Sequence, residues 1–162
     1  MVALATHSPP DEGGRVLWMV HRVDITRHTE EEAGLAYLAV AMYADSTDGA
    51  RYIEFQLADE DDRDSGYCIV DSPPLPVEPG DLLALAHMIV SHTTLYGGLL
   101  DATFSGHELI LTFDDQAQHT FNWPHILTLR LDISDDDRAA LRTSLPEVLA
   151  VGPDGKVPTV NL

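Results

Sequence analysis

The chain has little positive charge and a single lysine. Its 162 residues hold 27 acidic side chains against 9 Lys and Arg, a formal net charge of −18, and the lysine is Lys156. This excess of negative charge opposes binding to a phosphate backbone, because that affinity depends on Lys and Arg. It favours a basic protein partner, which it would attract and orient, although an acidic surface can also serve solubility alone. We therefore expect a protein partner and no nucleic acid.

Cysteine and long apolar runs are also scarce. Cys68 is the only cysteine, so an intrachain disulfide is excluded, and its apolar neighbours predict a buried thiol that does not act as a nucleophile. The longest apolar stretch, 82–90, is too short to span a bilayer and contains His87. The first residues lack the basic start and apolar region of a signal peptide. We expect a cytoplasmic protein that does not contact a membrane.

Motifs that carry catalysis are absent from the sequence. There is no GxSxG, HExxH, CxxC, Walker loop or Rossmann fingerprint. His87 and His92 are five residues apart, which puts them on different sides of a helix and makes them a poor metal pair. His119 could be paired with Asp114 or Asp115, but nothing in the sequence fixes that geometry. We expect no enzymatic activity, no cofactor and no metal site.

The most informative stretch is 51–71. It opens with alternation, which predicts a strand with Ile53, Phe55 and Leu57 on one side and Tyr52, Glu54 and Gln56 on the other. An acidic run follows, 59–64, with five acids in six residues, and it lacks the ordered spacing of an EF-hand loop. It is either a solvated loop or a partner contact. A second short strand, 67–70, closes the stretch.

Alternation and turn residues predict a sheet for the rest of the chain. The expected strands are 15–25, 34–44 and 126–133, together with 108–114, the second arm of a two-residue hairpin that 104–107 indicates. The glycine pair within 94–99 allows a bulge or a close backbone approach. The alanines of 34–44 would also suit a helix, but its period of two favours a strand. Residues 26–32 are expected to form a turn and 115–124 a polar loop.

Two segments favour helices. Residues 81–91 follow a proline-rich connector and are either a helix or a buried strand. Ser134 is expected to cap a helix whose apolar face includes Leu141, Leu145, Val148 and Leu149. We therefore expect an α+β fold: a mostly antiparallel sheet with one inserted helix and a C-terminal helix packed on one face. The predicted organisation is a flexible arm over 1–14, a single domain over 15–150 and a loose tail over 151–162.

Three short pieces of the sequence occur in an order that resembles a known family. They are RYIEFQ (51–56), YCIV (67–70) and YGG (96–98), followed by the alternating strands that end near Ile133. This order resembles the bacterial immunity protein 10 family, although the segment between Val70 and Tyr96 is longer than in that pattern. The resemblance implies a small cytoplasmic protein that neutralises a toxin of a polymorphic toxin system, and it implies no catalytic residues.

We therefore expect an immunity protein that blocks a cognate toxin by binding it, sterically and electrostatically. The alternative is an acidic α+β binding module unrelated to toxin immunity, and a homodimer is possible in either case. The residues expected to contact the partner are Tyr52, Glu54, Gln56, Asp59, Glu60, Asp61, Asp62, Asp64, Tyr67 and Tyr96.

Overall fold

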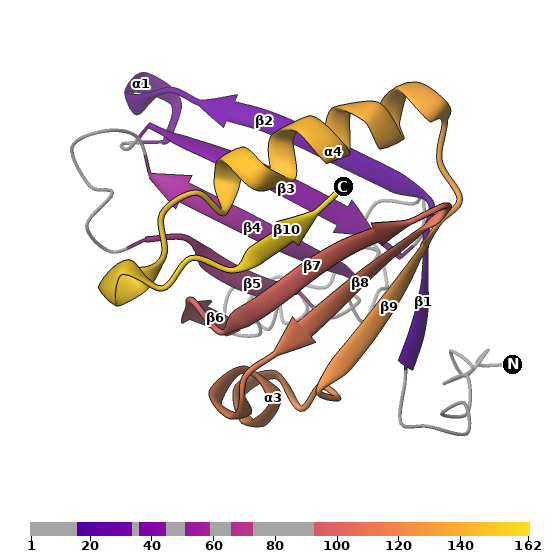
Figure 1. The fold of residues 1–162 in the computed structure, drawn as a ribbon. Coiled ribbons are helices and arrows are strands. Elements are labelled where there is room, and N and C mark those ends of the chain that lie inside the picture. The colour runs from indigo at the N-terminus through magenta and orange to yellow at the C-terminus, as the bar shows by residue number, and fades with distance from the viewer. Residues whose placement is uncertain (1–15, 34–35, 45–50, 59–65, 73–92) are drawn as a thin grey trace, which may run out of the picture.

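The computed structural model describes residues 16–33, 36–44, 51–58, 66–72 and 93–162 (Figure 1). Four of the predicted features lie outside these ranges: the N-terminal arm, the acidic run 59–64, the proline-rich connector and the helix or buried strand over 81–91. The predictions for these segments therefore remain predictions.

The described residues form an α+β fold, as the sequence indicated, but they build two five-stranded sheets instead of one. Sheet one has, in spatial order, β1 (Val16–Val20), β9 (Ile126–Leu131), β8 (Glu108–Phe113), β7 (Leu99–Ser105) and β10 (Thr159–Asn161). Sheet two has β2 (Arg22–His28), β3 (Tyr37–Tyr43), β4 (Tyr52–Ala58), β5 (Cys68–Ser72) and β6 (Thr93–Tyr96). The remaining elements are α1 (Glu30–Ala33), α3 (Asp115–Phe121), α4 (Asp135–Val148) and a 3₁₀ turn, η2 (Pro153–Gly155).

The sheets differ in the direction of their strands. Sheet two is antiparallel throughout. In sheet one the β7–β8 hairpin and β9 are antiparallel, while β1 joins β9 and β10 joins β7 in parallel. A two-residue hairpin turn is present, but one residue later than 104–107 predicted, because Ser105 pairs with Glu108 across Gly106 and His107.

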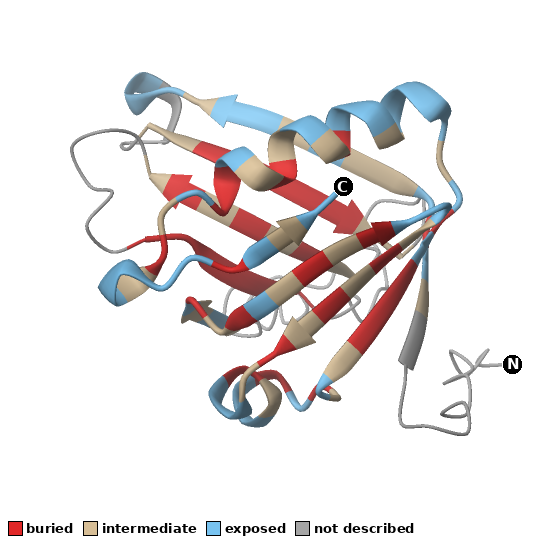
Figure 2. Cartoon of the chain, viewed as in Figure 1, coloured by how far each residue is buried: buried red, intermediate tan, exposed pale blue. Residues whose placement is uncertain are grey.

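The core lies between the inner faces of the two sheets. Alternation puts Leu109, Leu111 and Phe113 of β8 and Ile53, Phe55 and Leu57 of β4 in the same hydrophobic cluster. Figure 2 shows the result, with β3 buried along most of its length and the edge strand β2 largely exposed or intermediate.

Helix α4 covers part of the inner face of sheet two. Leu141, Leu145 and Val148 belong to the core cluster, and α4 packs on β2, β3 and β4 (Figure 1). Arg142 of α4 also reaches the Phe104 ring of β7, 5.2 Å from the guanidinium carbon to the ring centroid. Because α4 contacts both inner faces, the outer face of sheet two lies on the opposite side from this helix.

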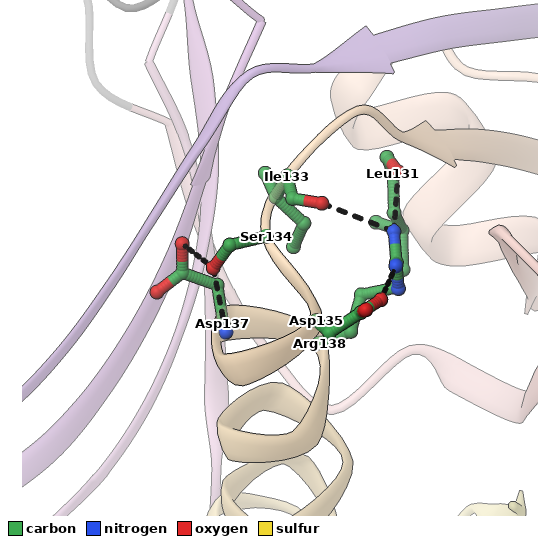
Figure 3. Close-up of polar contacts among 6 residues, drawn as sticks. All are labelled: Leu131, Ile133, Ser134, Asp135, Asp137 and Arg138. Carbon is green, nitrogen blue, oxygen red and sulfur yellow. Dashed lines mark hydrogen bonds and ion pairs between the residues drawn. The ribbon is translucent and has the colours of Figure 1, made fainter.

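The start of α4 agrees with the sequence prediction. The Ser134 hydroxyl accepts a hydrogen bond from the Asp137 amide at 3.1 Å and donates to the Asp137 carboxylate at 2.8 Å (Figure 3). Arg138 donates to the carbonyl of Ile133 at 3.0 Å and pairs with Asp135. These contacts fix the helix directly after β9.

Three predictions of local structure were wrong. The expected strand over 15–25 is two strands in different sheets, since the chain changes sheet at His21. In the expected turn over 26–32, β2 continues to His28 and α1 begins at Glu30. The expected polar loop over 115–124 contains α3, capped by Asp114 through a 2.8 Å bond from the Ala117 amide. The expected loose tail contains β10, whose Asn161 side chain donates to Asp101 at 2.9 Å.

Candidate functional site

The predicted contact residues of β4 lie on the outer face of sheet two. This face has one row of residues for each register position, because neighbouring strands are paired and side chains alternate. The rows are Arg22–Tyr43–Tyr52–Ser72, Asp24–Ala41–Glu54–Val70–Thr94, Thr26–Ala39–Gln56–Cys68–Tyr96 and His28–Tyr37–Ala58. We call these four rows the outer face. They contain four of the five tyrosines of the chain.

The first row is a ladder of side chains in contact, in which the two tyrosine rings are tilted by 41°. The Arg22 guanidinium carbon lies 3.8 Å from the centroid of the Tyr43 ring, and the Tyr43 and Tyr52 centroids are 5.0 Å apart. Tyr52 also forms a hydrogen bond with the Ser72 side chain. Arg22 Nε lies 3.4 Å from Asp24 in the next row. The ladder thus orders one guanidinium and two phenol rings at one end of the outer face.

A chain of hydrogen bonds runs across the middle rows. The Cys68 thiol donates to the Gln56 amide oxygen at 3.8 Å, and the Gln56 amide nitrogen donates to Glu54. The bond from Cys68 orients the Gln56 side chain so that its NH₂ group points to the carboxylate. Glu54 is therefore held in place by its neighbours, although it is only partly buried.

Burial and the charge of Glu54 both raise the pKa values of the tyrosine hydroxyls and the thiol on this face. Burial, followed by the Glu54 charge, raises the pKa of Tyr37. Burial is also the largest cause of the raised pKa values of Tyr43 and Tyr52, and Glu54 contributes to both. Burial and then Glu54 raise the pKa of Cys68 to about 11. At neutral pH these groups are neutral hydrogen-bond donors.

The structure brings together four of the predicted contact residues and separates a fifth from them. Tyr52, Glu54 and Gln56 are neighbours on β4, and Tyr96 is in the same row as Gln56 with 58% of its surface exposed. Tyr67 is 1% exposed, and its hydroxyl is bound to the backbone of Leu99. Its position is structural and leaves it no surface to offer a partner. The five predicted acids of the run 59–64 lie outside the described residues.

Sequence reasoning did not select Tyr37, Tyr43 and Arg22 as contact residues. A pattern that could have found the tyrosines was present, since Tyr37 and Tyr43 alternate with the core residues of β3 and share a side with Ala39 and Ala41. Pairing of β3 with β4 then puts Tyr43 directly beside Tyr52. Without that pairing, the sequence gives no reason to join the two strands into one surface.

No reactive constellation is assembled in the part of the chain that the structure describes. No group of three His, Cys, Asp or Glu residues there could hold a metal ion. Asp114, one of the acids considered as a partner for His119, caps α3 instead. A hollow at the end of β2, β3 and β4 contains Arg27 and Glu147, which pair with each other at 2.5 Å. The arrangement of the outer face suits binding through rings, amides and a carboxylate.

Comparison with known proteins gives no further guide to this surface. None of the family models, curated proteins or solved structures compared with the chain matches it. Among the described helices, none is long and apolar enough to cross a membrane.

Proposed function

We propose that this chain is a cytoplasmic immunity protein that binds a cognate bacterial toxin domain and blocks it without chemistry. The observation that carries the proposal is the outer face of sheet two, where Tyr52, Glu54 and Gln56 of β4 and Tyr96 of β6 lie on the two strands that pair with β5. The order of RYIEFQ, YCIV and YGG in the sequence supports the toxin-immunity interpretation, since it resembles the immunity protein 10 family.

Charge supports a basic partner. A toxin that cleaves nucleic acid needs a cationic surface for its substrate, and a protein with a net charge of −18 is complementary to such a surface. Covering that surface would exclude the substrate, so inhibition would require occupancy alone. Long-range attraction would also speed the encounter of the two proteins.

The contact residues divide into two roles. The acids of 59–64 steer association, so their removal should mainly lower the association rate. Tyr52 and Tyr96 supply rigid rings at the contact, so truncating them should mainly raise the dissociation rate. Tyr96 is the most exposed large hydrophobic residue of the described strands, which makes it the first choice for an anchor.

The first test is rescue by co-expression. The C-terminal domain encoded by the reading frame directly upstream would be expressed in a bacterial host with and without this chain. We expect growth only when both are present, together with a complex that survives gel filtration. Continued toxicity when both proteins accumulate in folded form would overturn the proposal.

The second test separates steering from net charge. One variant carries Asp59→Asn, Glu60→Gln, Asp61→Asn, Asp62→Asn and Asp64→Asn. A control removes the same charge from exposed acids of other elements: Glu31→Gln, Asp115→Asn, Asp132→Asn, Asp136→Asn and Asp154→Asn. We expect the first variant to associate about tenfold more slowly at low salt, with a smaller salt dependence, and the control to change less. Equal losses would show that only net charge matters and would remove the acidic run from the contact.

A further inference from the structure

Glu54 lies on the outer face beside a small residue, Ala41, which leaves space next to its carboxylate. It is only partly buried, and its row places it opposite Ala41 on β3, beyond which lies Asp24 on β2. Ala41 has no side chain beyond Cβ, so it does not fill the space between the two carboxylates. Adjacent strands are about 4.8 Å apart, which puts Asp24 and Glu54 on strands about 10 Å apart.

The hydrogen bonds of Glu54 leave capacity for a further donor. Its Oε1 accepts from the Gln56 amide, whose own oxygen is held by Cys68. In the described part of the chain no cationic side chain pairs with Glu54, whereas Asp24 is paired with Arg22. An ionised carboxylate can accept about four hydrogen bonds, so most of its accepting capacity remains.

The outer face already binds one guanidinium, that of Arg22, between a tyrosine ring and a carboxylate. Arg22 lies over the Tyr43 ring at 3.8 Å and within 3.4 Å of Asp24, so ring and carboxylate bind it together. Tyr52 and Glu54 repeat the combination on β4, two residues apart and on the same side of the strand. Tyr43 is diagonal to Glu54 in the register, so two rings border the carboxylate.

We infer that Glu54, bordered by Tyr43 and Tyr52 and oriented by Gln56, binds the guanidinium of an arginine side chain presented by the basic partner. Arginine fits better than lysine because its guanidinium is planar, weakly hydrated and able to stack on a ring while it donates two parallel bonds to a carboxylate. The inference rests on the proposed function only in taking this arginine from the toxin, since the binding site itself belongs to the chain.

The tyrosines of the chain provide the assay. Of five tyrosines, Tyr37, Tyr43, Tyr52 and Tyr96 are on the outer face and Tyr67 is in the core. Protein labelled with 3-fluorotyrosine would be titrated with N-acetylarginine amide and followed by ¹⁹F NMR. Its neutral isostere, N-acetylcitrulline amide, and N-acetyllysine amide serve as comparison probes. Single Tyr→Phe variants assign the signals.

We expect the signals of Tyr43 and Tyr52 to move with arginine amide, while the signal of Tyr67 stays in place. Citrulline amide should cause little change, and lysine amide should bind more weakly than arginine amide. Glu54→Gln should weaken arginine binding at least about fivefold. The matched control is Glu108→Gln, a partly buried glutamate of sheet one, and it should bind as the wild type does.

Three results would overturn the inference. They are an absence of any movement in the Tyr43 and Tyr52 signals, equal movement with citrulline amide, and unchanged binding by Glu54→Gln. The inference and the proposed function can fail separately. If the chain binds arginine but does not rescue growth in co-expression, the arginine site stands and the immunity role is wrong. If the chain rescues growth but does not bind arginine, the immunity role stands and the arginine site is wrong.

Discussion

The hydroxyl of Tyr67 forms two hydrogen bonds with one residue of the other sheet. It accepts from the Leu99 amide at 3.0 Å and donates to the Leu99 carbonyl at 3.2 Å. Tyr67 directly precedes β5 of sheet two, and Leu99 begins β7 of sheet one. The pair therefore ties the two sheets together near Gly97 and Gly98, where the chain crosses between them.

Replacing Tyr67 with Phe should destabilise the protein. The change keeps the ring in the core but removes both bonds, which leaves the Leu99 amide and carbonyl without this partner in a buried place. We expect the free energy of unfolding to fall by about 1–3 kcal/mol, measured by urea denaturation. Tyr96→Phe is the control, since Tyr96 is 58% exposed, and it should change stability by less than about 0.5 kcal/mol. Equal effects of the two changes would contradict the structural role of Tyr67.

A second prediction concerns Gly66, just before Tyr67. Its φ is +71°, and a Cβ built there would lie 2.4 Å from the backbone nitrogen of Pro153. Gly106, in the β7–β8 turn, has a similar φ of +59° but no atom within 4 Å of such a Cβ. Both Gly→Ala changes share a conformational cost of about 1–2 kcal/mol.

The two variants differ only in the close approach to Pro153. Gly66→Ala should therefore cost at least about 2 kcal/mol more than Gly106→Ala, because the 66–67 and 151–153 segments must separate. The Tyr67 amide, which donates to the Val151 carbonyl at 2.8 Å, would be disturbed by that separation. Urea or thermal unfolding of both variants measures the difference. Similar losses of stability in the two variants would mean that the backbone near Pro153 moves to accommodate the added Cβ at little cost.

Alternation allowed the central strands to be predicted, because their side chains face a core on one side only. β4 and β8 have this pattern, and β9 buries Leu127, Leu129 and Leu131 as expected but also buries Thr128 on its other side. The pattern cannot show which sheet a strand joins. β1 and β2 are separated by His21 alone, yet β1 pairs with β9 and β2 with β3.

Shorter elements were missed for other reasons. Helix α3 has seven residues and little apolar periodicity, but its caps were visible in the sequence as Asp114 before it and Asn122, in the left-handed region, after it. β10 has three residues and exists through its pairing with β7. The core side and the outer side of β4 could be predicted, while Tyr67 was misplaced because aromatic residues are as common in cores as at interfaces.

The Cys68 thiol should resist alkylation in the folded protein. It is 7% exposed, and its pKa is raised to about 11, so about one molecule in a thousand carries the thiolate at pH 8. We expect iodoacetamide to modify the native protein at least about a hundredfold more slowly than the urea-unfolded chain, as followed by mass spectrometry. Comparable rates in the two states would show that the thiol is accessible and ionisable on the outer face.

The last prediction concerns the pH dependence of stability at Asp71. This carboxyl is 9% exposed on the inner face of sheet two, 3.4 Å from Arg51, whose guanidinium also lies 4.2 Å from the Trp18 ring centroid. Burial raises the pKa of Asp71 above its ordinary value of 3.8, although Arg51 acts in the opposite direction. The native state therefore keeps a proton at pH values where the unfolded chain has released it.

Linkage then gives the sign of the effect. A raised native pKa adds stability that is fully present below pH 3.8 and is lost as the pH rises through the native value. Asp71→Asn cannot titrate, so the stability of the wild type relative to this variant should decrease between about pH 3 and pH 6. Urea unfolding of both proteins at half-unit steps measures this difference, with Asp136→Asn as an exposed control. A difference that grows with pH would mean that Arg51 outweighs burial and that the native pKa of Asp71 is lowered.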